Sequence, residues 1–476
     1  MSVFPRLETG IQGLDILTRG GIPKGRTTLI TGKSGTCKSI LSLQIASNLA
    51  RRGIKTMLIA VEEAPEDLVT SGDALGFGTG ELVESGMIRM LDLTRPLEGP
   101  TFVSGDYDVS GLLHRIEGAV KNAGSEALIL DSATALFSPR PPDEFLRNLF
   151  YRLIYALRKM NLTAIVTAEA PADYGQLTKL GVEDFVCDLV VIMRNIVDGE
   201  RRRRSIEVHK YRRSPHYKGE YPCTITAKGL IVFPLDVQER VNPLATERFS
   251  SGVKGLDEMN NGGWLRDSIV LVRGPSGSGK TTLSGMYARA GALRGERVIY
   301  YGFEETKQIL LRNFDQIGLP FDKLEREGSL RVTCRYPEAT SPEDLLVEVR
   351  LGLDEYKPSL VVLDSVSSIE HSTSKQGFRQ FMVGLASLLR EHGRSALLTQ
   401  TIGTFSDHDQ TAPYLSTIPD AILLMDYSFE GRELQRSMRV LKMRGSSHAT
   451  ERRQIMIEPG GIRVEPWPRA IRMSAE

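Results

Sequence analysis

Short runs of apolar, often β-branched residues recur along the chain and alternate with longer stretches of helical character. Residues 27–32 (TTLITG) and 269–274 (IVLVRG) are such runs, and each ends in glycine. The stretches that follow, 38–53 and 280–296, have the length and apolar spacing of helices. Strands separated by helix-length spacers predict parallel β-α-β units, and hence an α/β fold with helices on both faces of a mainly parallel sheet. Further runs of the strand type are 56–62, 127–132 and 163–169.

The whole pattern occurs twice. Residues 9–25 return as 251–267, and Lys38 and Lys280 occupy matching places 242 positions apart (280 − 38). Ordered self-similarity of this kind predicts a tandem duplication. Between the copies, prolines and weak periodicity near 235–247 suggest a boundary, so we expect domains at 1–240 and 241–476. Other matched segments are Glu62-Glu63 with Glu304-Glu305, 128–132 with 361–365, and 209–213 with 441–445.

Composition narrows the class of protein. Of 476 residues, 41% are hydrophobic and 25% are charged, which excludes disordered, collagen-like and coiled-coil chains. The net charge of +1 gives no bulk electrostatic reason to coat nucleic acid or a membrane. Four cysteines without CxxC spacing suggest neither a disulfide framework nor a zinc site. The apolar run at 189–193 is far shorter than the roughly 20 residues of a membrane span. Because the N-terminus also lacks a signal peptide, we expect a cytoplasmic protein.

A complete phosphate-binding loop lies in the second copy. Residues 274–281 read G-x-x-x-x-G-K-T, and they follow a predicted strand and open a predicted helix. Backbone N–H groups of such a loop surround phosphate oxygens at a helix N-terminus. Lys280 would neutralise the transferred phosphate, and the Thr281 hydroxyl would bind Mg²⁺. The nucleotide-binding residues expected here are Ser276, Gly277, Ser278, Gly279, Lys280, Thr281 and Thr282.

The corresponding loop of the first copy, 32–39, departs from the pattern because Cys37 stands where the second glycine belongs. Cysteine is small enough for the loop to close. A positive φ at that position would nevertheless cost roughly 1 kcal/mol or more. Nucleotide binding is expected here too, through Gly35, Thr36, Cys37, Lys38 and Ser39, with Ser39 also a metal ligand.

Acidic residues follow two further strands of each copy. Asp131 and Asp364 end apolar runs, where a carboxylate can polarise the water shell of Mg²⁺. An acidic pair ends the preceding strand, at the place where a glutamate of RecA-type ATPases activates the attacking hydroxyl or water. We therefore expect catalytic roles for Glu62, Glu63, Glu304 and Glu305, and metal roles for Ser39, Asp131, Thr281, Glu304 and Asp364.

Two cations lie two residues apart near the end of each copy. Lys210 and Arg212, like Lys442 and Arg444, project from one face of a strand if the strand alternates normally. Two cations on one face suit the phosphates of a nucleotide bound by a neighbouring subunit. The basic run 201–204 comes just before such a strand, and we expect it to decorate a solvated hairpin.

With these residues identified, the chain closely resembles the KaiC-type circadian clock ATPases, RecA-like proteins with two tandem ATPase domains. The resemblance spans about 5–460 and is strongest at the segment 9–25, the acidic pairs, KGEYPxTIT at 218–226 and KMRGS-x-H at 442–448. It implies a double-ring, ATP-dependent homohexamer with ATP between subunits. It further implies ATP hydrolysis in the N-terminal ring, and serine/threonine autophosphorylation with reversal in the C-terminal ring.

The resemblance also assigns residues. The phosphoacceptors would be Ser416 and Thr417, although Pro419 stands where the family has threonine. Glu304 would be the base for phosphate transfer, and Glu62 and Glu63 would serve hydrolysis. Contacts to the nucleotide across the subunit boundary would come from Lys210, Arg212, His216, Lys442, Arg444, Ser446 and His448, with Arg436 in support.

Two alternatives stay open on the sequence alone: a nucleic-acid motor of the RecA or DnaB kind, and a non-catalytic ATP-gated scaffold. The first needs basic loops that the near-neutral charge does not favour. The second is favoured by Cys37 and by the end of the chain at 462–476, without the long tail on which an activator of clock members acts. We therefore do not expect such an activator, whereas a small KaiB-like regulator remains a candidate partner.

Overall fold

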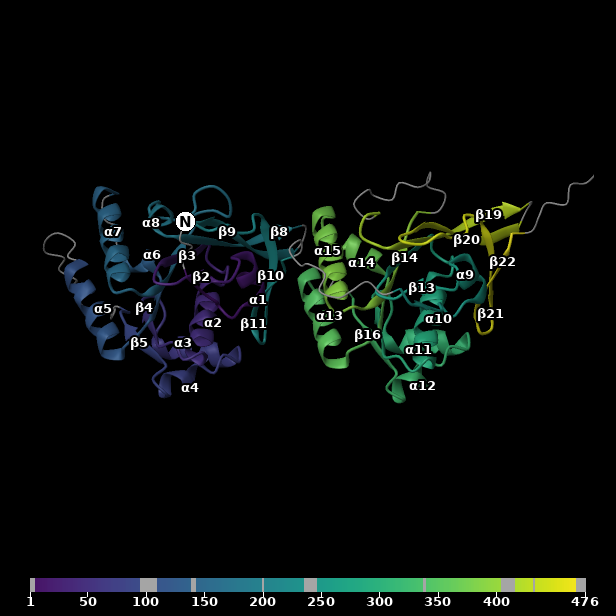
Figure 1. Ribbon diagram of the computed structural model, residues 1–476, viewed down its shortest axis with the longest axis horizontal. Coiled ribbons are helices and arrows are strands. Elements are labelled where there is room, and N and C mark those ends of the chain that lie inside the picture. Colours follow the sequence, from purple (N-terminus) through teal and green to yellow (C-terminus); the bar gives the residue numbers. More distant parts are fainter. Residues whose placement is uncertain are drawn as a thin grey trace, which may run out of the picture. The chain divides into compact units, whose positions relative to one another are not determined.

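The computed structural model describes residues 5–94, 109–137, 143–198, 201–234, 246–336, 340–403, 416–430 and 433–467. Contacts divide the chain into two compact units, Met1–Val237 and Gln238–Glu476. Within the described ranges each unit is built on a nine-stranded sheet with helices on both faces (Figure 1). The expected α/β fold with a mainly parallel sheet in each half is confirmed. Of the boundary predicted near 235–247, residues 235–245 lie outside the described ranges.

The N-terminal unit follows the predicted alternation of strands and helices. Its strands are β1 (Arg6–Leu7), β2 (Ile22–Pro23), β3 (Thr27–Gly32), β4 (Thr56–Ala60), β5 (Ile88–Asp92), β6 (Ala127–Asp131), β7 (Thr163–Glu169), β8 (Leu189–Asp198), β9 (Arg201–Tyr211), β10 (Glu220–Thr226) and β11 (Gly229–Val232). Its helices are α1 (Gln12–Leu17), α2 (Lys38–Arg51), α3 (Pro65–Ala74), α4 (Thr79–Glu84), α5 (Val109–Ala123), α6 (Ala133–Leu136), α7 (Asp143–Lys159) and α8 (Glu183–Val186).

The C-terminal unit repeats this order. Its strands are β12 (Arg248–Phe249), β13 (Trp264–Leu265), β14 (Ile269–Gly274), β15 (Val298–Gly302), β16 (Leu330–Cys334), β17 (Leu360–Asp364), β18 (Ser395–Thr401), β19 (Ala421–Glu430), β20 (Glu433–Met443), β21 (Arg453–Glu458) and β22 (Gly461–Pro466). Its helices are α9 (Lys254–Met259), α10 (Lys280–Leu293), α11 (Lys307–Gln316), α12 (Phe321–Arg326), α13 (Pro342–Tyr356), α14 (Val366–His371) and α15 (Lys375–Glu391).

The two large sheets have the same topology. Their strand orders are β11-β10-β9-β8-β3-β7-β6-β4-β5 and β22-β21-β20-β19-β14-β18-β17-β15-β16. In the first sheet, neighbouring strands pair in parallel along the series β8-β3-β7-β6-β4-β5. Neighbouring strands pair antiparallel along the series β8-β9-β10-β11. The strand before each phosphate loop, β3 or β14, therefore lies inside the sheet, and the neighbouring parallel strands end at the same edge.

Alternating residues of the central strands supply the two cores of the N-terminal unit. On β3, Leu29 packs with α5 and α7 residues such as Leu153, while Ile30 packs on the other face with α2 residues such as Leu41. Figure 1 shows α5 and α7 on one side of this sheet and α2 with α3 and α4 on the other. Both faces are covered, which explains why β3 is a continuous buried run rather than an alternating one.

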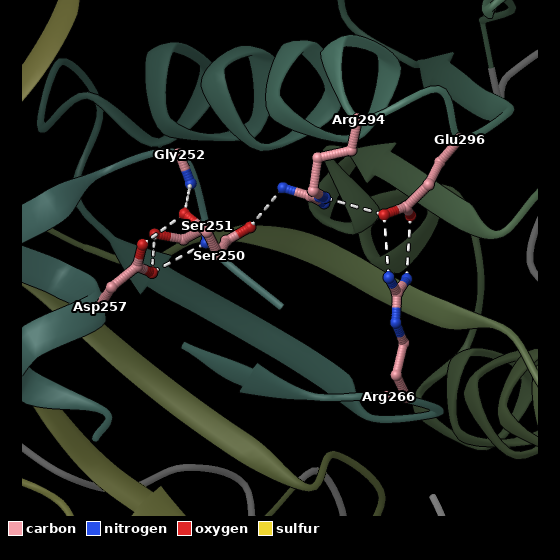
Figure 2. Close-up of polar contacts among 7 residues, drawn as sticks. All are labelled: Ser250, Ser251, Gly252, Asp257, Arg266, Arg294 and Glu296. Carbon is pink, nitrogen blue, oxygen red and sulfur yellow. Dashed lines mark hydrogen bonds and ion pairs between the residues drawn. The ribbon is translucent and has the colours of Figure 1, made fainter. Parts of the chain in front are cut away.

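The repeated G-x-x-G-L-D motif folds the turn before each sheet. The Asp257 carboxylate accepts hydrogen bonds from the backbone N–H (2.8 Å) and hydroxyl (2.6 Å) of Ser251, as Figure 2 shows. Asp15 does the same for Thr9 at 2.8 Å. A Cβ added at Gly255 would lie 2.1 Å from the Val464 carbonyl oxygen, and one added at Gly13 would lie 2.2 Å from the Val232 carbonyl oxygen. The motif is therefore required for packing.

The predicted strands and helices of the central sheets are present, and several end slightly earlier than predicted, as α2 and α10 do at Arg51 and Leu293. The runs at 27–32, 163–169 and 269–274 coincide with β3, β7 and β14. The basic run 201–204 was expected before a strand, but it forms the first residues of β9, because the β8–β9 hairpin continues its pairing to Asp198 opposite Arg201. In the described part of the chain, no helix has the length and apolar character needed to cross a membrane.

Candidate active site

The phosphate loop of the C-terminal unit connects β14 to α10. Gly279, the residue before α10, has φ 103°, a left-handed conformation that glycine adopts without strain. The Lys280 ammonium is buried under the loop and donates to the carbonyl oxygens of Gly274 and Pro275, both at 2.9 Å. Burial lowers the pKa of Lys280, and the negative charge of Asp364 opposes that shift. The loop thus holds a partly desolvated cation at a helix N-terminus.

The loop of the N-terminal unit closes in the same way around cysteine. Cys37 has φ 73°, in the left-handed region, at the place of Gly279. Lys38 donates to the Lys33 carbonyl at 3.0 Å, and burial lowers its pKa in the same manner as for Lys280. The positive φ considered in the sequence analysis is therefore adopted by a non-glycine residue, with a strain of about 1–2 kcal/mol.

The remaining loop residues form the expected turn. Gly35 and Gly277 have φ 79° and 77°. The Thr36 hydroxyl donates to the Lys33 carbonyl at 2.8 Å, whereas the buried Ser278 hydroxyl has no hydrogen-bond partner among the described residues. Thr281 is exposed and Thr282 is half-buried on the first turn of α10. An unsatisfied buried hydroxyl and the exposed Thr281 beside the loop fit a site that is completed by a ligand.

Asp364 lies at the end of β17, under the phosphate loop. Its carboxylate accepts hydrogen bonds from Thr399 and, at 2.7 Å, from Tyr300. Burial raises the pKa of Asp364, and these hydrogen bonds lower it in part. In the N-terminal unit, Asp131 lies at the end of β6 and accepts a hydrogen bond from Thr167 of β7. The parallel strands thus place each predicted metal-binding aspartate next to its phosphate loop.

The two members of each acidic pair differ in their contacts. Glu304 accepts a hydrogen bond from the Ser365 hydroxyl at 2.7 Å, which directs it toward the end of β17. Glu305 instead accepts one from Asn313 of α11 at 2.9 Å. Glu62 accepts from Ser132 at 2.5 Å, matching Glu304.

Ser132 and Ser365 were not predicted as site residues. Each directly follows the aspartate in the matched segments 128–132 and 361–365, so the repeat itself carried the signal. In the N-terminal unit, burial and the charge of Asp131 raise the pKa of Glu63. A glutamate of raised pKa beside another carboxylate is a feature of acid-base sites.

The donor set fits Mg²⁺ bound together with a nucleotide. Hydroxyls of Ser39 and Thr281 and carboxylates of Asp131 and Asp364 are hard oxygen ligands, which Mg²⁺ prefers. Within the described ranges no group of three or more His, Cys, Asp or Glu side chains gathers as a metal cage.

The paired cations of each unit lie together and away from their own phosphate loop. Lys442 donates to the carbonyls of Ser416 (2.6 Å) and Pro419 (2.7 Å), and Arg444 donates to that of Thr417 (2.7 Å). The predicted phosphoacceptors therefore sit directly on this cation pair. In the N-terminal unit, Lys210 and Arg212 donate to the carbonyls of Asp184 and Phe185, both at 2.6 Å.

The arginine of each cation pair lines a surface pocket. Arg444 lines a pocket of about 590 Å³ together with Trp264, Arg266 and Asp420. Figure 2 shows Arg266 paired with Glu296, whose carboxylate accepts hydrogen bonds from the two terminal guanidinium nitrogens, both at 2.9 Å. Arg212 lines a pocket of about 510 Å³. Glu296 occupies the guanidinium fork of Arg266, so this arginine shapes the pocket while its charge is already balanced.

The four remaining residues that were predicted to contact the nucleotide lie in different places. Arg436 lies on the phosphate loop of its own unit, where its Nε donates to the Gly277 carbonyl at 3.1 Å. Ser446 accepts a hydrogen bond from Arg248, at the pocket of Arg444. His216 and His448 lie in the segments after β9 and β20, and burial lowers the pKa of His216.

Tyr427 was not predicted as a site residue. Its hydroxyl donates to the Ser276 carbonyl at 3.0 Å, beside the contact of Arg436, and so holds the phosphate loop from β19. Asn195 occupies the same place in the N-terminal unit and donates to the Gly35 carbonyl at 3.2 Å. Neither residue belongs to a motif, so the only signal was its position in the repeat.

Comparison with known proteins identifies the family. The KaiC ATPase family matches residues 7–237 and again 249–469. The circadian clock oscillator protein KaiC of Parathermosynechococcus lividus is 37% identical over 97% of this chain and 85% of its own length. The circadian clock protein KaiC3 of Synechocystis is 38% identical over 96% of this chain and 91% of its own length. The chain therefore belongs to the KaiC ATPase family and carries two tandem KaiC domains.

Proposed function

We propose that this KaiC-family ATPase binds Mg²⁺ and ATP in both units, hydrolyses ATP in the N-terminal unit and phosphorylates itself on Ser416 or Thr417 in the C-terminal unit. The reverse reaction would return the phosphate from these residues. We further propose that the chain works as a homohexamer, with each nucleotide completed by the cation pair of a neighbouring copy. Relatives named as circadian clock proteins support a role in timing or signalling.

The observation that carries the proposal is the contact between Lys442, Arg444 and the segment 416–419. These cations have carbonyl partners in their own unit but contact no part of its phosphate loop in the described structure. A nucleotide brought to them by another copy would meet Ser416 and Thr417 at the same place. Thr417 is exposed and Ser416 is half-buried.

The chemistry then follows from the acidic pair. Glu304 would accept the proton of the Ser416 or Thr417 hydroxyl as its oxygen bonds to the γ-phosphorus, and the β–γ bridging oxygen would leave with ADP. Lys280 would stay against the phosphates and offset their charge. Mg²⁺, bound with the nucleotide near Thr281 and Asp364, would neutralise phosphate charge. In the N-terminal unit, Glu62 and Glu63 would orient a water in place of the acceptor hydroxyl.

Labelled phosphate tests the proposal. Full-length protein incubated with Mg²⁺ and [γ-³²P]ATP should acquire label, and phosphopeptide mass spectrometry should place it on Ser416 or Thr417. The double variant S416A/T417A should lose at least nine-tenths of the label, whereas S329A, a serine before β16, should retain it. Hydrolysis without any label would leave an ATPase that signals by binding partners. Hydrolysis that rises with single-stranded DNA would indicate a nucleic-acid motor.

A further inference from the structure

The carboxylate of Asp364 is held by a tyrosine that no motif includes. The Tyr300 hydroxyl donates to Asp364 Oδ2 at 2.7 Å, and Thr399 donates to Oδ1 on the other side. The Ser284 hydroxyl of α10 lies 2.9 Å from the Tyr300 oxygen and 2.8 Å from the Thr281 carbonyl oxygen, and its one proton can be donated to either of them. Tyr300 thus connects the carboxylate at the end of β17 to the first turns of the phosphate-loop helix.

The ring of Tyr300 is fixed in the core. Tyr300 is fully buried on β15, and its ring packs edge-on against Phe314 at 5.7 Å and Phe321 at 5.6 Å between centroids. A buried hydroxyl requires a hydrogen-bond partner, and Asp364 and Ser284 supply two. Because the ring cannot turn within this packing, the hydroxyl holds the carboxylate in one orientation.

The N-terminal unit lacks this arrangement. Leu58 stands at the place of Tyr300: it pairs with Ile129 of β6 just as Tyr300 pairs with Val362 of β17. Leu58 is buried and apolar, so it donates no hydrogen bond to Asp131. Ser42, the counterpart of Ser284, donates to the Ser39 carbonyl at 3.0 Å, and among the described residues it has no hydrogen bond to a tyrosine. The two sites therefore share their motif residues and differ in what supports the aspartate.

We propose that Tyr300 is a positioning residue for Asp364 and that it gives the C-terminal site a tighter hold on its divalent cation than the N-terminal site has. The inference rests on the proposed binding of metal and ATP in the C-terminal unit. Hydrogen-bond partners behind a ligand orient it, and their removal typically lowers metal affinity about 10- to 100-fold. Thr399 still holds Asp364 when the tyrosine hydroxyl is removed, so we expect a loss of about tenfold, at the lower end of that range.

Manganese binding gives a readout that does not depend on turnover. Full-length protein carrying Lys38→Ala, which weakens the N-terminal site, is loaded with a non-hydrolysable ATP analogue and titrated with Mn²⁺, and free Mn²⁺ is measured by electron paramagnetic resonance. Tyr300→Phe keeps the ring and removes one oxygen, and it should weaken Mn²⁺ binding about tenfold. Affinity for the analogue measured in EDTA should stay within twofold.

Tyr287→Phe is the matched control, because Tyr287 is a fully buried tyrosine of the same core whose hydroxyl has no hydrogen-bond partner in the described ranges. It should leave Mn²⁺ affinity unchanged. Equal Mn²⁺ affinity in Tyr300→Phe and the parent would overturn the inference. If the parent binds no Mn²⁺ with the analogue, the proposed function fails first. Should Tyr300→Phe not fold, Ser284→Ala replaces it, with an expected loss of about threefold and with no change as the contradicting result.

Discussion

At the scale of single residues, Cys37 departs from the phosphate-loop pattern that the second copy keeps. It adopts φ 73° where Gly279 adopts 103°. The left-handed conformation costs a non-glycine residue about 1–2 kcal/mol, and glycine loses roughly 0.5–1 kcal/mol of that gain to its larger unfolded-state entropy. Cys37→Gly should therefore raise the free energy of unfolding of the N-terminal unit by about 0.5–1 kcal/mol. Urea denaturation followed by circular dichroism measures the change.

The rate of ATP hydrolysis should respond less to Cys37→Gly than the free energy of unfolding does, because the loop already closes around cysteine. In a Lys280→Ala background, which silences the C-terminal site, Cys37→Gly should raise ATP hydrolysis by no more than about twofold, since Lys38 and Asp131 keep their places. Cys37→Ala is the matched control, since alanine retains the strained Cβ. A fall in turnover on Cys37→Gly would contradict this account and assign a role to the thiol.

The acidic pair at the end of β15 allows a sharper test. Glu304 is directed to Ser365, and Glu305 is engaged by Asn313 of α11. Glu304→Gln keeps the shape but cannot accept a proton, so it should slow phosphate incorporation about 10²- to 10⁴-fold with ATP still bound. Glu305→Gln should change the rate less than about fivefold, because its amide can still pair with Asn313. Phosphorimaging of single-turnover reactions measures the phosphorylation rates of the two variants. Equal loss of rate in both would show that Glu304 and Glu305 act together as the base.

Residues with fixed motif spacing were predictable, and residues that act through tertiary contacts were not. Lys280 and Glu304 lie at one constant offset from their counterparts in the first copy, and Asp364 ends a recognisable apolar run as its counterpart does. Tyr300 and Tyr427 become part of the site only because neighbouring strands bring them to Asp364 and to the phosphate loop. Tyr300 also breaks the repeat, so comparing the copies would have discarded it as ordinary core.

At the scale of elements, β20 holds the segment that precedes β19. Lys442 donates to the carbonyls of Ser416 and Pro419, and hydrogen bonds from a charged donor contribute about 1.5–3 kcal/mol. Lys442→Ala should therefore let this segment open locally. Backbone amides of 416–420 should exchange with deuterium about tenfold faster or more in hydrogen-exchange mass spectrometry.

Lys210→Ala is the control for that measurement, since Lys210 holds the Asp184 carbonyl in the other unit. It should speed exchange near 184–186 and leave 416–420 unchanged. Unaltered exchange of 416–420 in Lys442→Ala would show that the segment is held by other contacts. In that case the cation pair would not control the acceptors.

Strands were predicted best where a residue that typically ends a strand, such as glycine, also ends it in the structure. The run 27–32 ends in the glycine of the phosphate loop, and β3 ends there too. The start of β9 was missed, because hairpin pairing with β8 carries the strand through a basic run whose composition is typical of loops. That pairing includes a register shift between Val190 and Val191, which depends on the partner strand and leaves no mark in a single sequence.

At the scale of the whole molecule, the two units share one topology and each presents an arginine at a surface pocket. Neither Arg212 nor Arg444 contacts its own phosphate loop in the described structure, and we propose that each completes a nucleotide site of a neighbouring copy. ATP would then act as part of the interface, and binding that requires two subunits links nucleotide to assembly by mass action. The protein should accordingly form hexamers in Mg²⁺ and ATP and dissociate when nucleotide is removed.

Arg444→Ala tests this linkage. Loss of a charge-assisted contact to phosphate costs about 1.5–3 kcal/mol per site, so hexamers in ATP should require at least about tenfold more protein. The fold of the unit should persist, because Lys442 still holds the segment 416–419.

Arg444→Lys is the matched control: it keeps the charge, loses the fork geometry and should fall between the alanine variant and the parent in its tendency to form hexamers. Gel filtration with light scattering across a dilution series in ATP, and thermal unfolding without it, separate assembly from folding. Hexamers that form equally well in Arg444→Ala would exclude a nucleotide contact across the subunit boundary at this residue.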